Sequence, residues 1–397
     1  MPRPEITIPL RLLRIAQAVA RRGSAAAAAA ELHLSASAVS RAVKQAEDML
    51  GLPLFERGAR GMVCTLAGQA LFQRVTRALA ELVRGGGQRL AGRATDAMLQ
   101  ALHAVAELRS ESAAGRRLGV TQAAVNHSLR QLEHAAGVSL FQRSQRGTRL
   151  SEAGERLLLR AELARVELRS GHDELAALCG LAPGRIAVGA LPMAGDVLVP
   201  QALARLFAVM PGVQATVVDG TYEALVDQLR HGEVDLVVGP LRGEQAPADL
   251  REQLLFIDHL VPVVRAGHPL ARSRGGARTL AALLALPWIG PLPGTPARAA
   301  FERAFDTEGL AVPPVSLQVN SPAVVRALLL ASDAVALLSP LQVRGEVGAG
   351  QLRVLPVAVQ RTERAIGLML RRDGLPSPAL RALLMELQVV AAVSMRS

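Results

Sequence analysis

Two clusters of hydrogen-bonding and basic side chains stand out in the first 150 residues of the chain. They are Ser35, Ser37, Ser40, Arg41 and Lys44, and then Thr121, Gln122, Asn126, His127 and Arg130. Hydroxyl, amide, imidazole and guanidinium groups on a narrow helix can donate and accept hydrogen bonds at base edges in a DNA major groove. Taken alone, Arg41, Lys44 or Arg130 is equally typical of a solvated helix face, and His127 of an exposed polar residue. The occurrence of the pattern twice favours base contact.

Further arginines follow each cluster in short turns that contain glycine. They are Arg57 and Arg60 in the sequence FERGARG, and Arg143, Arg146 and Arg149 in FQRSQRGTR. Arginines in such turns would lie over phosphates or reach into the minor groove. We expect them to contribute affinity and register more than sequence choice.

Both clusters belong to an internal repeat with an offset of 86 residues. Residues 34–71 align without a gap on residues 120–157. Each copy predicts a helix, a short second helix, a third helix that carries the cluster, and a tight two-stranded turn. The predicted caps are Ser24, Ser35 and Gly51 in the first copy, and Ser110, Thr121 and Gly137 in the second. This order of elements is that of a winged helix-turn-helix, present here twice.

A longer helix is expected after each copy, over residues 66–84 and 151–178. The second has wide apolar coverage, which predicts that it pairs with another helix. The run Gly85 to Gly87 would be a flexible joint between the copies. Pairing of the two long helices within one chain would make a pseudo-dimeric head. In the alternative arrangement, only the second copy reads DNA and the first is a packing module.

The net charge is concentrated in the same region. The chain has 45 Lys and Arg against 34 Asp and Glu, a net charge of +11, and residues 1–180 hold 25 basic and 16 acidic residues, which gives +9. This surplus indicates a polyanionic partner for the N-terminal part, although a preference for arginine can also reflect coding bias. A hydrophobic content of 50% excludes wholesale disorder. Two distant cysteines exclude a disulfide framework and a four-ligand zinc site.

Several other classes of protein are disfavoured. No apolar run approaches the roughly 18 residues that span a bilayer, and the opening sequence MPRPEITIPLRLLR lacks a signal-peptide core. We therefore expect a cytoplasmic protein rather than a periplasmic solute-binding protein. The sequence has no nucleophile elbow, phosphate-binding loop, dinucleotide fingerprint or metal-spaced His/Cys cluster, so we expect neither an enzyme nor a bound cofactor.

The pattern changes after Gly180. Short apolar strands such as GRIAVGAL and VDLVVGPL alternate with amphipathic helices, and the scheme recurs from LPWIGPL to DAVALLSP. Such alternation predicts a mostly parallel sheet covered on both faces, and its recurrence predicts two subdomains.

These segments together resemble the LysR-type transcriptional regulators, with the DNA-binding head of that family in tandem duplication. AVSRAVKQAEDMLGLPLFER and AAVNHSLRQLEHAAGVSLFQRSQRGTRLSEAG resemble the family's head, and GRIAVGALP, LRHGEVDLVVGPL and VVRAGHPLA its effector domain. GALP, PLPGTPARAAFERAF, ALLSPLQV and RAIGLMLR are most similar to the regulators of galactose-binding-protein and protocatechuate-catabolism genes. The first copy departs from the family pattern at Ser35-Ala36-Ser37 and Ala46, and the aromatic that commonly follows the capping serine is Ala25 in one copy and Glu111 in the other.

The resemblance implies a multidomain protein: two all-α winged helix-turn-helix copies with linker helices, then an α/β effector domain of two subdomains like a periplasmic binding protein. The implied division is a first winged helix-turn-helix (1–65), a linker helix and joint (66–94), a second winged helix-turn-helix (95–150), a linker helix (151–180) and the effector domain (181–397).

It also implies an effector crevice between the subdomains, at the carboxyl ends of strands. Candidate wall residues are Leu191, Pro192, Met193, Thr221, Thr295, Arg298, Ser321 and Ser339. Arg298 is equally explained as a surface arginine, and Leu191 to Met193 as core residues. The implied partners are double-stranded DNA, a small effector such as a sugar or an aromatic acid, RNA polymerase, and further copies of the chain in a dimer or tetramer.

Overall fold

The computed structural model divides the chain into two compact units, residues 1–184 and 185–397. The residues it describes are 8–58, 61–144, 147–180, 184–272 and 279–394. Within these ranges no helix combines the length and the apolar character that crossing a membrane requires.

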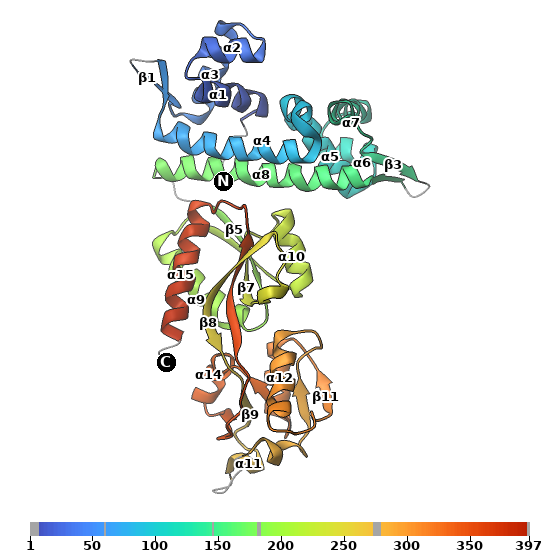
Figure 1. Cartoon of the computed structure of the whole chain (residues 1–397), viewed down its shortest axis with the longest axis vertical. Coiled ribbons are helices and arrows are strands. Elements are labelled where there is room, and N and C mark those ends of the chain that lie inside the picture. The colour runs from blue at the N-terminus through green and yellow to red at the C-terminus, as the bar shows by residue number, and fades with distance from the viewer. Residues whose placement is uncertain (1–7, 59–60, 145–146, 181–183, 273–278, 395–397) are drawn as a thin grey trace. The chain divides into compact units, whose positions relative to one another are not determined.

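The first unit contains two heads that are built in the same order (Figure 1). The first head consists of α1 (Leu10–Arg22), α2 (Ala25–Leu32), α3 (Ala36–Leu50), β1 (Phe55–Gly58) and β2 (Gly61–Cys64). The second head consists of α5 (Asp96–Leu108), α6 (Glu111–Leu118), α7 (Gln122–Ala136), β3 (Phe141–Ser144) and β4 (Gly147–Leu150). Three helices followed by an antiparallel two-stranded wing is the order that the sequence predicted for each copy.

Equivalent residues cap both ends of the third helix in each head. The hydroxyls of Ser35 and Thr121 each accept the backbone N–H three residues further on, at 3.2 Å, and so cap α3 and α7. Gly51 and Gly137 end the two helices with φ angles of 68° and 74°, a conformation that favours glycine. The predicted caps of these helices are confirmed.

A glutamate ties each third helix to the strand that follows it. The carboxylate of Glu47 accepts the backbone N–H of Leu54 at 2.8 Å, and that of Glu133 accepts the N–H of Leu140 at 2.8 Å. Each carboxylate also accepts the next N–H along the strand. These two glutamates are identical in the repeat because they hold the wing against the helix, a role that does not involve DNA.

Two long helices, α4 (Leu66–Arg93) and α8 (Glu152–Leu178), pack side by side beneath the heads (Figure 1). The joint expected at Gly85 to Gly87 lies within α4, and its flexibility stays a prediction. The backbone leaves helical geometry only at Gly86 and Gly87, and the helix then resumes. Leu90, in the resumed turn, is completely buried, and burial of this side chain holds the segment against the protein.

The contacts between α4 and α8 recur with the offset of the repeat. Arg74 Nη1 donates to Glu167 Oε2 at 2.9 Å, and Arg160 Nη1 donates to Glu81 Oε2 at 2.9 Å. Position 160 is 74 plus 86, and 167 is 81 plus 86. The same pair of positions therefore meets twice with the helices exchanged, which is the signature of a two-fold, antiparallel interface.

Two glycines allow the helices to approach closely at equivalent points. A Cβ atom at Gly85 would lie 3.0 Å from Cβ of Arg160, and one at Gly171 would lie 3.1 Å from Cβ of Arg74. Positions 85 and 171 again differ by 86. Each glycine thus accommodates the stem of the arginine on the opposite helix.

The heads also meet near the starts of their first helices. The backbone N–H of Leu10 donates to Asp96 Oδ2 at 3.0 Å, and these are equivalent positions in the repeat. Arg14 Nη1 donates to the carbonyl of Ala91 at 2.7 Å, which joins α1 to the end of α4. Equivalent residues in contact mark the point where a two-fold axis would pass.

The second unit contains two five-stranded sheets. The first, in the order β6-β5-β7-β14-β8, is built from β5 (Arg185–Ala190), β6 (Gln214–Asp219), β7 (Leu236–Pro240), β8 (Leu250–Asp258) and β14 (Arg364–Arg371). The second, in the order β11-β10-β12-β9-β13, is built from β9 (Val261–Arg265), β10 (Trp288–Gly290), β11 (Val315–Gln318), β12 (Val335–Leu338) and β13 (Leu352–Val354).

The helices of this unit are grouped here by the sheet whose strands they adjoin in the sequence. With the first sheet are η1 (Ala194–Leu198), α9 (Val199–Val209), α10 (Tyr222–His231), η2 (Gly243–Gln245) and α15 (Pro378–Ser394). With the second are α11 (Pro269–Arg272), η3 (Leu280–Leu283), α12 (Pro296–Thr307), α13 (Pro322–Ala331) and α14 (Pro340–Gly348). The core of the second sheet contains Trp288, completely buried, with Phe301 and Phe305 edge-on at 5.4 and 5.3 Å.

The sheets are mostly parallel, as predicted: in each sheet four of the five strands run in one direction and one strand runs against them. β14 runs antiparallel to β7 and β8, and β9 runs antiparallel to β12 and β13. The chain leaves the first sheet from β8 directly into β9, and returns from β13 into β14. The reversed strand of each sheet, β14 or β9, is the one that the chain enters directly from the other sheet.

Candidate nucleic-acid interface and effector region

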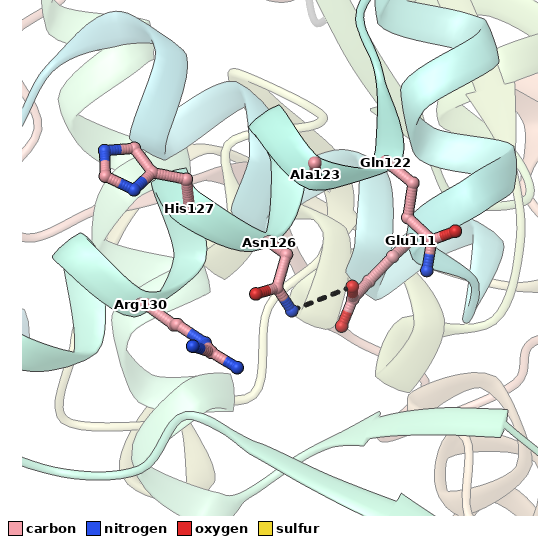
Figure 2. Close-up of a pocket in the computed structure, with 6 residues that line it drawn as sticks. All are labelled: Glu111, Gln122, Ala123, Asn126, His127 and Arg130. Carbon is pink, nitrogen blue, oxygen red and sulfur yellow. Dashed lines mark hydrogen bonds between the residues drawn. The ribbon is translucent and has the colours of Figure 1, made fainter.

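An open pocket of about 440 Å³ lies between α6 and α7 of the second head (Figure 2). It is lined by Glu111, Gln122, Ala123, Asn126, His127 and Arg130. Figure 2 shows the Asn126 amide turned toward Glu111, and Asn126 Nδ2 donates to Glu111 Oε2 at 3.0 Å. The pocket therefore gathers a carboxylate, two carboxamides, an imidazole and a guanidinium on one surface.

Neighbouring side chains fix how these groups face outward. Ser112 Oγ donates to Gln122 Oε1 at 2.8 Å, which leaves the Gln122 amide nitrogen as a donor. Gln131 Nε2 lies 2.8 Å from His127 Nε2, and the amide nitrogen is the donor of the two.

The pocket includes four of the five residues predicted as the second cluster. The fifth, Thr121, is the N-cap of α7, with its side-chain oxygen held by a backbone N–H. Glu111 and Ser112 were missed as functional candidates. The signal for Glu111 was its place in the sequence, because a carboxylate follows the capping serine where the family commonly has an aromatic.

The corresponding surface of the first head is simpler. Ser35 Oγ caps α3 and lies 3.1 Å from Ser37 Oγ, so each hydroxyl already has a partner. Ser40, Arg41 and Lys44 are exposed along the same helix. This face of α3 carries cations and short hydroxyls.

The wing arginines lie on or beside the two hairpins. Arg149 is exposed on β4, and Arg57 and Arg143 belong to β1 and β3. The remaining two, Arg60 and Arg146, fall outside the described residues.

Three effector candidates are helix caps at the ends of strands. Thr221, Thr295 and Ser321 cap α10, α12 and α13, and each side-chain oxygen accepts the N–H three residues on, at 3.1 to 3.5 Å. Arg298 lies in the first turn of α12 and donates to Glu302 at 2.6 Å. A helix start with an arginine beside it suits an anionic group.

Three other effector candidates follow β5, and two of them are buried. Leu191 and Met193 are 6% and 1% exposed and pack into two hydrophobic clusters, while Pro192 between them is exposed. Met193 adopts a φ of 80°, which is unusual for a residue with a side chain. The turn after β5 packs the side chains of Leu191 and Met193 among apolar neighbours, and their place in the wall of an effector crevice stays a prediction.

Ser339 is likewise buried, with no exposed surface. Its hydroxyl donates to Asp258 Oδ1 at 2.6 Å, and the other oxygen of Asp258 is paired with Arg364. Two buried opposite charges require such extra hydrogen bonds to offset their desolvation. Ser339 therefore supports a buried ion pair at the point where β8 ends.

Residues that sequence reasoning missed link the two subdomains near the caps. Arg242 donates to the carbonyl of Gly294 at 3.2 Å, and its guanidinium carbon lies 4.3 Å from the ring centre of Tyr222. The Tyr222 hydroxyl and Arg298 Nη1 are buried atoms without a hydrogen-bond partner among the described residues. Burial raises the pKa of the Tyr222 phenol, so this group remains a neutral donor.

The described residues contain no group of three or more His, Cys, Asp or Glu side chains that could hold a metal ion. Paired winged helices with exposed polar third helices, followed by two α/β subdomains, define a DNA-binding protein with a ligand-binding domain.

The chain belongs to the LysR family of bacterial transcriptional regulators. The family's helix-turn-helix model, "Bacterial regulatory helix-turn-helix protein, lysR family", matches residues 10–69 and again residues 97–155. The "LysR substrate binding domain" matches residues 180–391. The protein is thus a DNA-binding regulator of transcription, not an enzyme.

Individual relatives support the subgroup suggested by the sequence. The chain is 35% identical to the transcriptional regulator GalR of Pseudomonas putida over 374 residues, covering 92% of this chain and 93% of that one. It is 33% identical to PcaQ of Agrobacterium fabrum over 293 residues, covering 74% and 94%. The structure of full-length OxyR from Pseudomonas aeruginosa has the same fold, with a TM-score of 0.54, 20% identity and coverage of 75% and 94%.

Proposed function

We propose that one chain of this regulator carries a complete pair of DNA-binding heads, produced by tandem duplication. The observation that carries this proposal is the recurrence of the α4–α8 contacts with an offset of 86, including Arg74 with Glu167 and Arg160 with Glu81. The two matches to the helix-turn-helix model support it. The alignment with GalR supports it as well, because it covers 92% of this chain. The remaining 8% is shorter than either helix-turn-helix match, so the alignment includes at least part of both heads.

The proposed division follows the sequence expectation. The two winged helix-turn-helix segments are residues 1–65 and 95–150, with linker segments 66–94 and 151–180 and an effector domain from 181 onward. The split of the chain into units at residue 184 supports the last boundary. The proposed DNA contacts are Ser37, Ser40, Arg41, Lys44, Gln122, Asn126, His127 and Arg130, with the wing arginines and the caps Ser35 and Thr121 toward phosphates.

The effector domain is proposed to work like a periplasmic binding protein, with a small molecule between its two subdomains. Support comes from the group Thr295, Arg298, Tyr222 and Arg242, which offers buried donors beside a helix start. Thr221, Ser321 and Pro192 complete the proposed wall. Donors of this kind suit a carboxylate or hydroxyl groups, so an aromatic acid or a sugar is the proposed effector.

Exposed apolar side chains on the effector domain support self-association. Phe207 and Val209 on α9, Val217 on the edge strand β6, and Val324 and Leu330 on α13 are each at least 40% exposed. Apolar faces of this kind mark protein interfaces. A dimer formed there has four heads. We propose that the protein acts in the cytoplasm and that RNA polymerase is a further partner at the regulated promoter.

Footprinting of the full chain, with the number of bound chains counted by mass photometry, tests the paired heads. Two heads that contact successive major grooves are expected to protect about 20 base pairs per chain, since such sites lie one helical turn apart. Protection of only about 10 base pairs per bound chain would show that a single head contacts DNA and would refute the proposal.

A further inference from the structure

The two heads share their internal contacts but differ on the surface of the third helix. The helix caps and the glutamates that hold each wing recur with the offset of 86. The same offset places Ala25 opposite Glu111, Ala36 opposite Gln122, Ser40 opposite Asn126, Arg41 opposite His127 and Lys44 opposite Arg130. The scaffold is therefore symmetric, while the exposed chemistry is not.

The second head offers paired donors and acceptors in fixed orientations. Glu111 keeps one carboxylate oxygen beyond its bond to Asn126, and Asn126 keeps its own carbonyl oxygen and one N–H. The bond from Ser112 leaves Gln122 as a donor, and Arg130 adds a fork of donors at the edge of the pocket. Carboxamides pair with adenine, guanidinium with guanine and a carboxylate with the amino group of cytosine.

The first head lacks this combination. Ala25 and Ala36 carry no polar atoms, and the Ser35 hydroxyl already contacts Ser37 Oγ and a backbone N–H. Arg41 and Lys44 are exposed cations without an equivalent of Glu111 beside them. Cations in such a setting attract phosphate oxygens, which are identical at every base step.

We propose that the chain recognises a one-sided operator. The second head reads bases in one half-site, and the first head holds the adjoining half through its phosphates without reading its sequence. The ligand is therefore a DNA duplex in which a single half-site is specified. This inference rests on the proposed function, because it requires both heads to contact DNA.

Selection of binding sites tests the inference directly. The full chain is incubated with a pool of duplexes that contain 40 randomised base pairs, and the retained DNA is sequenced over several rounds. The expected motif is one specified half-site per bound chain, with the chains on each retained duplex counted by mass photometry. Two equally specified halves within the footprint of one chain would overturn the inference while leaving paired-head binding intact. Failure to retain any duplex at low salt would instead refute the proposed function.

Two variant chains exchange the exposed faces and act as matched controls. One variant gives the second head the face of the first, with Glu111→Ala, Gln122→Ala, Asn126→Ser, His127→Arg and Arg130→Lys. The other gives the first head the face of the second, with Ala25→Glu, Ala36→Gln, Ser40→Asn, Arg41→His and Lys44→Arg. Circular dichroism melts establish that each variant is folded.

The first exchange is expected to reduce discrimination between the selected duplex and a scrambled one by at least about 30-fold, the effect of losing two base-pairing side chains at the low end of their range. The second exchange is expected to convert the selected motif into an inverted repeat. Retained discrimination in the first variant, or an unchanged one-sided motif in the second, would each contradict the proposal.

A third variant separates phosphate contact from base contact. Arg41→Ala with Lys44→Ala is expected to weaken binding to selected and scrambled duplexes equally, and to reduce the slope of log affinity against log salt by about two. If this variant alters which sequences are preferred, then the first head reads bases and the inference is wrong. An unchanged salt slope would show that the first head does not hold phosphates, with the same conclusion.

Discussion

Replacement of Arg74 by methionine should destabilise the first unit much more than the same change at its repeat partner, Arg160. The Arg74 side chain is completely buried and bonds to Glu167 at 2.9 Å and to Glu174 at 2.6 Å. The Arg160 side chain is 36% exposed and pairs with Glu81 alone at 2.9 Å. The two positions are equivalent in the interface, so burial and the number of partners are what differ.

The expected magnitudes follow from that difference. Removing one partner of a buried charge group costs about 3–5 kcal/mol because the remaining charge stays buried without compensation. Arg77 still contacts Glu167 at 2.9 Å in the Arg74→Met chain, so we expect the lower end, about 3 kcal/mol. A partly exposed pair contributes about 1 kcal/mol or less, which is our expectation for Arg160→Met.

Urea denaturation can follow each unit separately. Far-UV circular dichroism reports mainly on the helical first unit, and fluorescence of Trp288, the only tryptophan of the chain, reports on the second. At an m value of about 2 kcal/mol per molar, the Arg74→Met midpoint in circular dichroism should fall by about 1.5 M and that of Arg160→Met by at most about 0.5 M. Equal shifts in the two variants, or a shift in the Trp288 transition, would refute the reasoning.

Three further predictions use contrasts that the chain itself supplies. Gly85→Ala should destabilise the first unit by about 1–3 kcal/mol because the new Cβ would lie 2.9 Å from Leu157 Cδ1, whereas Gly92→Ala, with nothing within 4 Å, should be neutral or slightly stabilising; circular dichroism melts compare them. Glu47→Ala and Glu133→Ala should each cost about 1–3 kcal/mol in the same assay, since each strips two backbone N–H groups of their acceptor, and an effect in only one head would contradict the equivalence. Iodoacetamide should modify Cys179, which is exposed, well before Cys64, because burial raises the pKa of the Cys64 thiol and lowers its thiolate fraction at neutral pH; mass spectrometry of partial digests gives the order, and faster labelling of Cys64 would contradict it.

Local signals made much of the first unit predictable. Serine or threonine before a helix and glycine after it are determined by backbone hydrogen bonds and by the left-handed conformation, and both were read correctly at Ser35, Thr121, Gly51 and Gly137. The repeat itself supplied the order of elements without any tertiary information.

What the sequence could not supply depends on contacts between distant residues. A joint was expected at Gly85 to Gly87, but not the return of the chain to helix directly after it, with Leu90 buried against distant residues. Ser339 looked like a pocket residue from its position after a strand, and only the fold brings Asp258 to it. The mostly parallel sheets were predicted, but the one reversed strand in each was not, because local pattern does not reveal that the chain crosses twice between them.

The sequence identified most residues of the candidate DNA-binding pocket, but not the contacts that arrange their side chains. The polar cluster on α7 was visible as a list of side chains, but the role of Glu111 depends on α6 lying against α7. Likewise, Arg242 contacts both Tyr222, which is 20 residues earlier in the chain, and Gly294, which is 52 residues later. Neither contact has a local signature.

The pairing of α4 with α8 within one polypeptide changes what a single mutation can do. In a symmetric homodimer every substitution occurs twice, so one half of an interface cannot change without the other. Here each codon alters one side only, and the covalent connection keeps the halves together at any protein concentration. The equivalent positions Arg74 and Arg160 accordingly differ in burial and in partners. Each side of the α4–α8 interface can therefore vary by mutation while the other side stays the same.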